Sequence, residues 1–446
     1  MARPRKNVVK DQNSLLTPDN VVEIPVEEQP YPLPKGWKWV RLGDLTKIIG
    51  GGTPSSKVKE YYDGDIPWLS PADLSDYQEV YISRGKKMIT LAGLNNSSAR
   101  MMPAGTVCLS SRAPIGYVVI AKNPLCTNQG FKSFLPSHLY IPNFLYWYLK
   151  GNKPLLESYA SGTTFLELSG SKIARIEFPL PTIDEQQSIV DRIESLFAKL
   201  DEAREKAEAV LDGFESRKAA ILHKAFTGEL TAKWRTLKNI SLDSWVSCPL
   251  ISVLKEKPRN GYSPKPVDYK TSIKSMTLSA TTSGFFRSEF FKYIDEEIPD
   301  DSHLWLSYGD ILIQRANSIE KVGTSAIYTG CEHEFIYPDL MMKLRVKSSY
   351  SYRYIAYILS THTVLGYFRA NATGTAGNMP KINQQTVSNT PIVVPSYNEQ
   401  NEIVRILDEL LEKERQVKEA AEDVLERIDL MKKAILAKAF RGELTR

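Results

Sequence analysis

The sequence predicts an α/β (α+β) protein in which two mixed α/β domains are separated by a long antiparallel two-helix coiled coil, with a pseudo-two-fold internal repeat. Three observations predict this fold: an internal repeat, a long heptad pattern in each copy of it, and short β-rich runs between the copies. The chain has 446 residues, 42% of them hydrophobic, which is enough for several domains with real cores. No apolar run approaches the roughly 18–20 residues that a membrane span needs.

The internal repeat has an offset of 214 residues. Residues 221–231 read ILHKAFTGELT, and residues 435–445 read ILAKAFRGELT. Over 181–231, 23 of 51 positions are identical to 395–445 without a gap. Chance would give only a few identities, so the sequence indicates a duplication.

Each repeat copy predicts a helix of about 40 residues, because apolar residues recur at alternating spacings of four and three, as in a coiled coil. Pro181 and Pro395 precede the two helices, and Gly228 and Gly442 mark their ends. The chain holds no third similar helix, which favours pairing of the two copies with each other. The alternative is that each is a core helix of a larger bundle.

The predicted heptad seam is interrupted only by Arg217 and Glu414. The residues predicted to pair the helices are Ile189, Ile193, Leu196, Leu200, Val210, Phe214, Ile221, Ile403, Leu407, Leu410, Val417, Val424, Ile428, Met431 and Ile435.

The two longer segments between the repeats predict mixed α/β domains. Short β-rich runs are punctuated by glycine, proline, serine and asparagine, and each segment closes with an aromatic-rich helical stretch. The runs lie at 106–109, 117–120, 178–180 and 310–313, and the helical stretches at 144–149 and 352–359. The predicted organisation is a flexible leader at 1–32, domains at 33–180 and 236–394, and helical spacers at 181–235 and 395–446.

The net charge of +5 is distributed unevenly. The first domain carries 17 basic and 10 acidic residues (+7), and the second carries 17 and 14 (+3). Each helical spacer has a net charge of −2, from 9 basic and 11 acidic and from 10 basic and 12 acidic residues. Basic domains suit an anionic partner such as DNA. The acidity of the helices fits a solvated exterior, a docking face for other proteins, or both.

Signatures of catalysis and cofactor binding are missing from the sequence. The glycine-rich run at 50–57 lacks the phosphate-loop spacing, so it is expected to be a surface loop that could approach a DNA backbone. The five histidines and four cysteines form no metal-ligand pattern, and scattered cysteines fit a reducing cytoplasm. We therefore expect no metal, no catalytic residues and a cytoplasmic location, because the basic N-terminus has no apolar signal core.

The order of variable domain, repeat helix, variable domain and repeat helix resembles the specificity subunit (HsdS) of type I restriction-modification systems. The resemblance covers about residues 33–446. The opening LPKGWKWV at 33–40 is similar to the family's domain start, and Glu-Gln at 185–186 and 399–400 resembles its domain-to-helix junctions. The run GGTPS at 51–55 with DIPW at 65–68 is similar to one class of its recognition domains.

The resemblance implies a non-catalytic subunit in which each domain reads one half of a bipartite site in double-stranded DNA. The paired helices would set the gap between the halves and dock two modification (methyltransferase) subunits. Two restriction subunits, which are translocases and nucleases, would complete the complex. S-adenosylmethionine, ATP and Mg would be bound by these partners, with no cofactor on this chain and no membrane. The alternatives are a self-contained DNA methyltransferase or nuclease, and a coiled-coil adaptor that does not bind DNA.

Candidate DNA-binding residues are chosen by residue type and loop-like context, because basic and amide side chains contact phosphates and base edges. For each of them the alternative is an ordinary solvated surface role. They are Thr53, Ser55, Lys57, Arg84, Lys86, Arg112, Asn128 and Gln129 in the first domain, and Arg259, Asn260, Tyr262, Lys265, Arg315, Asn317 and Lys381 in the second.

Overall fold

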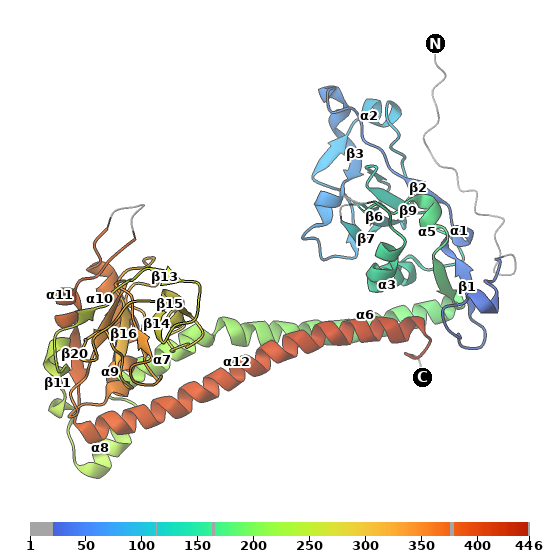
Figure 1. The fold of residues 1–446 in the computed structure, drawn as a ribbon. Helices are drawn as coiled ribbons and strands as arrows, with labels where there is room; N and C mark the ends of the chain where they lie inside the picture. Colours follow the sequence, from blue (N-terminus) through green and yellow to red (C-terminus); the bar gives the residue numbers. More distant parts are fainter. Residues whose placement is uncertain (1–20, 113, 163–165, 375–378, 445–446) are drawn as a thin grey trace. The chain divides into compact units, whose positions relative to one another are not determined.

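The computed structural model describes residues 21–112, 114–162, 166–374 and 379–444 (Figure 1). The chain forms two compact units. Unit 1 comprises residues 1–206 with 423–446, and unit 2 comprises residues 207–422. Each unit contains one mixed α/β domain and part of both long helices, so the compact units do not end where the predicted domains meet the helices. No helix in the described part of the chain has the length and hydropathy that crossing a membrane requires.

Unit 1 is built on a five-stranded sheet with the order β2-β9-β6-β7-β4 and a three-stranded sheet with the order β5-β3-β8. A further antiparallel pair, β1 with β10, lies beside the start of the long helix α6. The strands are β1 (Lys38–Arg41), β2 (Ile48–Gly50), β3 (Tyr62–Leu69), β4 (Tyr81–Ile82), β5 (Lys87–Ile89), β6 (Val107–Ser111), β7 (Ile115–Ala121), β8 (Cys126–Thr127), β9 (Phe131–Phe134) and β10 (Glu177–Leu180). The helices are α1 (Leu42–Leu45), α2 (Leu91–Asn95), α3 (Pro142–Gly151), α4 (Lys153–Ser158), α5 (Gly170–Ile173) and α6 (Ile183–Asp212), which ends in unit 2.

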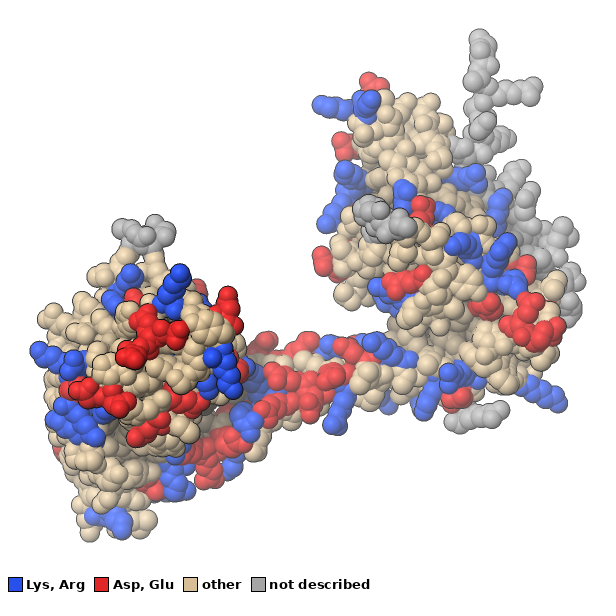
Figure 2. Space-filling view, viewed as in Figure 1, with Lys and Arg blue, Asp and Glu red and all other residues tan. Residues whose placement is uncertain are grey.

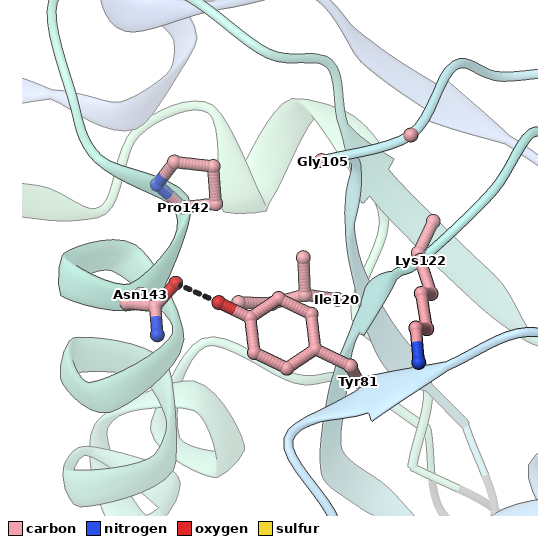
Figure 3. Close-up of a pocket in the computed structure, with 8 residues that line it drawn as sticks. Tyr81, Gly105, Ile120, Lys122, Pro142 and Asn143 are labelled. Carbon is pink, nitrogen blue, oxygen red and sulfur yellow. Dashed lines mark hydrogen bonds between the residues drawn. The ribbon is translucent and has the colours of Figure 1, made fainter. Parts of the chain in front are cut away.

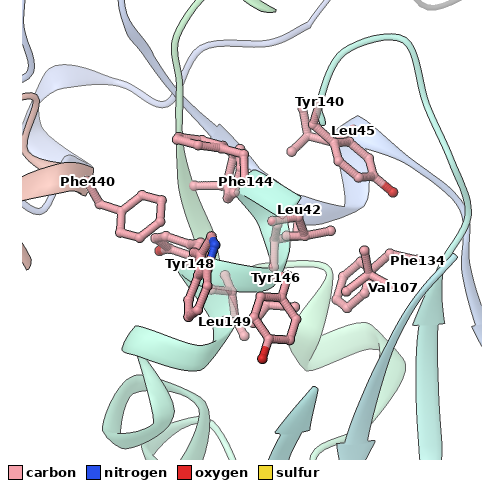
Figure 4. Packing of buried hydrophobic residues seen from close by; sticks show 14 of the residues in the cluster. Leu42, Leu45, Val107, Phe134, Tyr140, Phe144, Tyr146, Tyr148, Leu149 and Phe440 are labelled. Carbon is pink, nitrogen blue, oxygen red and sulfur yellow. The ribbon is translucent and has the colours of Figure 1, made fainter. Parts of the chain in front are cut away.

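The core of unit 1 joins its sheet to the long helices. Aromatic residues of α3 pack between the five-stranded sheet and the last turn of α12 (Tyr397–Phe440). Figure 4 shows Phe440 pointing toward Phe144 and Tyr148, whose ring centroids each lie 5.1 Å from that of Phe440. The aromatic stretch predicted at 144–149 is therefore a core helix, and it fastens the end of α12 to this domain.

Unit 2 also consists of two sheets and a separate antiparallel strand pair, but its sheets have different numbers of strands. Its sheets have the orders β12-β19-β16-β17 and β13-β15-β14-β18, and β11 pairs with β20. The strands are β11 (Val246–Pro249), β12 (Arg259–Asn260), β13 (Pro266–Val267), β14 (Ile273–Met276), β15 (Phe291–Ile294), β16 (Ile311–Gln314), β17 (Ser325–Ile327), β18 (Phe335–Ile336), β19 (Met341–Leu344) and β20 (Pro391–Val394). The helices are α7 (Phe214–Phe226), α8 (Ala232–Lys238), α9 (Tyr352–Leu359), α10 (His362–Ala370), α11 (Gln384–Ser388) and α12, which begins here and ends in unit 1.

The predicted β-rich runs correspond to β6, β7, β10 and β16, and the two aromatic stretches to α3 and α9. The proline signals are confirmed as well, because α6 and α12 each begin two residues after their proline. Gly228 and Gly442 have positive φ angles of 82° and 73°, as expected of glycines at helix ends.

The long helices pair antiparallel within each unit. In unit 1, Asp201 and Arg204 of α6 form ion pairs with Lys432 and Asp429 of α12. Residue numbers rise along one helix as they fall along the other, which is the antiparallel arrangement (Figure 1). In unit 2, Arg217 pairs with Glu414 at 2.8 Å, and Phe214 lies under Lys418 at 5.1 Å. The two residues that interrupt the heptad seam are therefore partners of each other.

A glutamine ties each long helix to its domain. Gln186 accepts a hydrogen bond from the backbone N–H of Ile141, the residue that precedes α3, at 2.8 Å, and donates to Leu139 O at 3.0 Å. Gln400 likewise accepts from the N–H of Ser351, which precedes α9, at 2.8 Å. Both glutamines are buried, so the Glu-Gln pair noted in the sequence marks a contact that satisfies buried backbone groups.

Residues 21–32, the described part of the predicted leader, make several contacts with the rest of unit 1. Val21 and Ile24 are buried, and the N–H of Ile24 donates to Trp39 O at 2.8 Å. The hydroxyl of Tyr31 donates to Phe440 O at 3.2 Å. These residues, which the family resemblance does not cover, thus bury apolar surface beside β1 and the end of α12. Residues 1–20 lie outside the described residues.

Candidate nucleic-acid interface

A tight glycine turn is built in the same way in both units. A Cβ at Gly51 would lie 2.3 Å from Thr127 O and 2.1 Å from Asn128 O. A Cβ at Gly261 would lie 2.1 Å from Tyr337 O and 2.3 Å from Pro338 O. Neither position has room for a side chain, so both turns require glycine for a close backbone approach.

The residue two positions after each glycine carries a hydroxyl that holds the neighbouring loop. Thr53 Oγ1 donates to Gln129 Oε1 in unit 1. Ser263 Oγ donates to Asp339 Oδ1 at 2.5 Å in unit 2, and the N–H of Asp339 donates back to Ser263 Oγ at 3.1 Å. The sequence analysis missed this second copy, although Gly-X-Thr/Ser-Pro recurs at an offset of 210.

A short hairpin lies beside each turn. Ser161 and Glu167 exchange backbone hydrogen bonds of 2.9 and 3.1 Å in unit 1, and Thr373 and Lys381 exchange two of 2.8 Å in unit 2. The strand that leads into this hairpin region, β6 or β16, is followed by a residue that bridges to the hairpin. The bridging pairs are Arg112 with Glu167 and Ala316 with Lys381.

These parts form one continuous feature, which we call the turn edge. The N–H of Ser111 donates to Gly130 O at 2.7 Å, and the N–H of Arg315 donates to Leu340 O at 2.9 Å, so the strand end and the loop after the glycine turn are joined in both units. The described residues of the turn edge are 51–55, 111–112, 128–132, 161 and 167 in unit 1, and 261–265, 315–316, 338–342, 373 and 381 in unit 2.

In unit 1 the structure brings together three of the predicted residues. Thr53 and Gln129 contact each other, and Arg112 lies at the same turn edge with its Nη1 4.0 Å from Glu167 Oε2. Asn128 has a local role, because its Oδ1 accepts from the N–H of Gly130 at 2.8 Å. The remaining predicted residues of unit 1 are exposed. Ser55 is the last residue of the glycine turn, and the other three lie outside the turn edge; they are Lys57, Arg84 and Lys86.

In unit 2, Arg315 and Lys381 lie at the turn edge, and Arg315 Nη1 donates to Asp339 O at 3.2 Å. Asn317 donates to Gln314 Oε1 at 2.7 Å, and the Nε2 of Gln314 in turn donates to Leu278 O and to the Oγ1 of Thr281 at 2.9 Å each. A buried glutamine therefore supports the surface around Asn317.

Of the other predicted residues of unit 2, two have side-chain partners and one is exposed to solvent. Arg259 pairs with Glu256 at 3.1 Å, and Tyr262 donates to Glu296 at 3.1 Å. Asn260 lies in β12, and Lys265 is exposed. Ion pairing reduces the number of donors that Arg259 can offer to DNA.

Lysines buried beneath the surface differ between the units. Lys132 of unit 1, which the sequence analysis missed, is half-buried, and burial lowers its pKa. Lys343 of unit 2 is buried, and burial lowers its pKa to about 8 while Asp310 opposes the shift. Its Nζ donates to Trp305 O at 3.0 Å. Because backbone carbonyl groups accept hydrogen bonds from its buried ammonium group, Lys343 has a structural role.

The described residues include four free cysteines and no cluster of three or more histidine, cysteine, aspartate or glutamate residues that could hold a metal ion. Burial raises the pKa of the Cys108 and Cys126 thiols to about 12, so neither is a thiolate near neutral pH.

A cavity of about 490 Å³ lies on unit 1 between β4, β7 and the start of α3 (Figure 3). Tyr81 donates to Asn143 Oδ1 at 2.7 Å across it, and Asn143 donates to Glu194 of α6 at 3.1 Å. Gly105 also lines the cavity. In unit 2, Gly309 occupies the equivalent position before β16, and the ring of Tyr352 lies 3.6 Å from where a Cβ at Gly309 would be. The cavity lies at the opposite end of β6 from the turn edge.

Charge alone does not mark an interface. On the face shown in Figure 2, basic and acidic side chains are intermingled over both units. The helix pair carries many of its charges as ion pairs within one helix, such as Arg415 with Glu412 at 2.6 Å. The turn edge is therefore identified by its repeated construction rather than by a patch of one sign.

The residues predicted to pair the helices differ in burial. Ile189, Ile193, Ile403, Leu407 and Ile428 are buried, and the first two also pack against the domain of unit 1. Val417, Val424 and Met431 are 47%, 40% and 44% exposed. Those partly buried are Leu196, Leu200, Val210, Phe214, Ile221, Leu410 and Ile435. In a pair of helices each helix covers only one side of the other, so part of the heptad seam stays exposed to solvent.

Comparison with known proteins adds independent information. Residues 34–210 and 262–427 match the family model described as the type I restriction modification DNA specificity domain. A segment of 182 residues is 43% identical to the MjaIX specificity subunit of Methanocaldococcus jannaschii, which is 40% of this chain and 42% of that one. The EcoKI specificity subunit of Escherichia coli is 24% identical over 422 residues, 93% of this chain and 90% of that one.

Two solved structures share the fold. One, from a study of complex assembly and conformational transition of the type I restriction-modification system, has a TM-score of 0.70 at 19% identity and covers 93% of this chain and all of that one. The HsdS subunit of Thermoanaerobacter tengcongensis has a TM-score of 0.63 at 19% identity, with coverage of 93% and 99%.

Proposed function

Because the chain belongs to the type I restriction modification DNA specificity domain family, we propose that each unit reads one half of a bipartite DNA site through its turn edge. Membership in this family supports a DNA specificity subunit over a self-contained methyltransferase or nuclease and over an adaptor that does not bind DNA.

The observation that carries the proposal is that one backbone frame is built twice with different side chains. Thr53 with Gln129 in unit 1 becomes Ser263 with Asp339 in unit 2. Base edges in the major groove are distinguished by the donors and acceptors that face them. A constant frame that carries exchanged donors and acceptors suits two domains that recognise different sequences.

The helix pair is proposed to dock two modification subunits and to set the gap between the half-sites. The exposed seam residues Val417, Val424 and Met431 support docking, because apolar side chains left open by two helices can be covered by helices of a partner. At 1.5 Å per residue, the 44 residues of α12 span about 66 Å, which exceeds one turn of B-DNA of about 34 Å. A helix of this length is sufficient to span such a gap.

The chemistry is assigned to the partners. Modification subunits would supply S-adenosylmethionine and methyl transfer to adenine, and two restriction subunits would supply ATP- and Mg-dependent translocation and cleavage. This chain would hold no cofactor and would work in the cytoplasm.

The test is the methylated sequence of a host that expresses this chain with its modification subunit. We expect one bipartite motif, and exchange of residues 33–178 for those of another family member should change only one half of it. A change in both halves, or methyl transfer by the purified chain alone, would contradict the proposal. Insertion of one heptad into a single long helix should abolish assembly or alter the gap, and an unchanged gap would exclude the spacing role.

A further inference from the structure

We propose that Lys132 and Arg112 form a binding site for one phosphodiester group of the DNA backbone at the turn edge of unit 1, and that unit 2 has neither of these two cations at the equivalent positions. The inference rests on the proposed function, which brings DNA to the turn edge. It adds that the two units place their cations differently along the turn edge, so that only unit 1 makes this particular phosphate contact.

Lys132 is placed for this role by the sheet. It lies on β9 opposite Gly50 of β2 and Leu109 of β6. A Cβ added at Gly50 or at Gly170 would meet only the Cδ and Cε atoms of Lys132, at 3.8 to 4.0 Å, so the stem of the lysine runs past two residues that have no side chain. The stem is thus sheltered, and the Nζ lies 3.5 Å from Ser111 Oγ at the turn edge.

The local charges leave a cation in excess. Arg112 follows Ser111, and its Nη1 is 4.0 Å from Glu167 Oε2, a long distance for an ion pair. Among the described residues, no carboxylate lies within 4.0 Å of Lys132 Nζ. Two cations therefore share one loosely held carboxylate.

Burial of the ammonium group is costly unless an anion is nearby. Burial lowers the pKa of Lys132 and the neighbouring Arg112 lowers it further, whereas Glu167 raises it. A phosphate oxygen next to both cations would relieve the desolvation and the like-charge repulsion together.

Unit 2 has none of these three side chains at the equivalent positions. By strand register, Met342 occupies the place of Lys132, because Leu312 and Ile313 of β16 face β19 as Cys108 and Leu109 of β6 face β9. Met342 is fully buried. The bridging pair is Ala316 with Lys381 instead of Arg112 with Glu167. Unit 2 therefore has a buried methionine where unit 1 has Lys132, so the backbone frame does not need a lysine there. Its own cations, Arg315 and Lys381, occupy the places of Ser111 and Glu167.

The test measures how DNA affinity depends on salt, using the purified complex with its modification subunit and a duplex that carries the methylated motif. Each phosphate contact contributes about 0.9 to the slope of log K against log salt. We expect Lys132→Met, which introduces the residue used in unit 2, to lower the slope by about this amount. The gain in affinity from 200 to 50 mM salt would then be about 3.5-fold smaller than in the wild type.

Lys122→Met is the matched control. It removes the same charge next to the same sheet, because Lys122 directly follows β7. Lys122 lies at the end of β7 that pairs with Val107, whereas Ser111 pairs with Ile115 at the other end of that strand. Its slope should equal that of the wild type. Arg112→Ala, which introduces the residue found at 316, should lower the slope as Lys132→Met does. The double variant should lose no more than either single variant, since one phosphate is held and holding it requires both cations.

Glu167→Gln should have the opposite effect and bind DNA several-fold more tightly at low salt, because it removes the competing carboxylate. The methylated motif should stay unchanged in all of these variants, since phosphate contacts carry no sequence information.

An unchanged slope in Lys132→Met, additive losses that sum to about two phosphates, or an altered first half-site would each overturn the inference and leave the proposed function intact. A wild-type complex that shows no salt-dependent binding to its motif would instead refute the proposed function.

Discussion

The junctions between helix and domain in units 1 and 2 share one contact and differ in the residue next to it. Gln186 and Gln400 make the same hydrogen bond to the backbone that precedes a core helix. The preceding residues differ, because Glu185 is exposed and its carboxylate accepts a hydrogen bond from the hydroxyl of Thr182, whereas Glu399 is fully buried. The duplication has kept the contact that satisfies backbone groups and has allowed the neighbouring side chain to acquire a separate role.

Glu399 is the centre of a buried network found in unit 2. Its Oε1 accepts from Arg235 at 2.7 Å and from Thr231 at 2.8 Å, and its Oε2 accepts from the indole N–H of Trp245 at 3.0 Å. In unit 1 the residue that corresponds to Thr231 lies outside the described residues. The difference teaches that repeated sequence motifs identify equivalent backbone positions but not equivalent energetics.

The largest effect is expected from breaking this network. Glu399→Ala leaves the buried Arg235 guanidinium without a carboxylate, which should cost about 3–5 kcal/mol, whereas Glu185→Ala removes an exposed cap and should cost about 1 kcal/mol. Native-state hydrogen exchange resolved by peptide would measure both, at the starts of α12 and α6. Equal costs at the two junctions would contradict the difference described here.

The shared glutamine should have similar effects in both units. Gln186→Leu and Gln400→Leu each leave a buried backbone N–H without its partner, which should cost about 1–3 kcal/mol. The same exchange measurement should find both junctions weakened by comparable amounts. An effect confined to one unit would show that the two glutamines are not equivalent.

A smaller effect is expected within the helix pair. Arg217 and Glu414 in unit 2 correspond, through the offset of 214, to Met431 and Leu200 in unit 1. Arg217→Met and Glu414→Leu should each destabilise unit 2, and the double variant should recover most of the loss, with a coupling of about 1 kcal/mol because the pair is partly exposed. A double-mutant cycle from urea unfolding would measure it, and additive losses would exclude a specific pair.

The smallest effect concerns pH and compares Lys343 with Ser133, which occupies the same register position in unit 1. Because burial lowers the pKa of Lys343 to about 8 from 10.5, the unfolded chain binds more protons between those values. The contribution of Lys343 to the stability of unit 2 should therefore rise with pH from about 8 to 10.5. The measurement is the difference in urea midpoint between the wild type and Lys343→Met, because buried tyrosines with raised pKa values, such as Tyr337, titrate in both proteins. This difference should shift in favour of the wild type as the pH rises from about 8 to 10.5, and a constant difference would contradict the assignment.

The sequence alone determined the repeat, the two long helices with their proline and glycine boundaries, the strands around β6, β7, β10 and β16, and the family. Periodicity and local residue preferences record how one segment is buried, and the offset of 214 is visible because no insertion interrupts residues 181–231. The sequence also placed Arg112, Thr53, Gln129, Arg315 and Lys381 among its candidates, and the structure brings these residues to the turn edges.

Only the tertiary structure revealed that there are two turn edges. The second glycine turn recurs at an offset of 210 rather than 214, so the ungapped repeat hides it. Thr53 and Gln129 are 76 residues apart, and sheet register alone decides that they meet. The same holds for Lys132, whose exposure to a partner depends on two glycines that pass beside it from other segments. Periodicity describes single elements, whereas an interface depends on contacts between them.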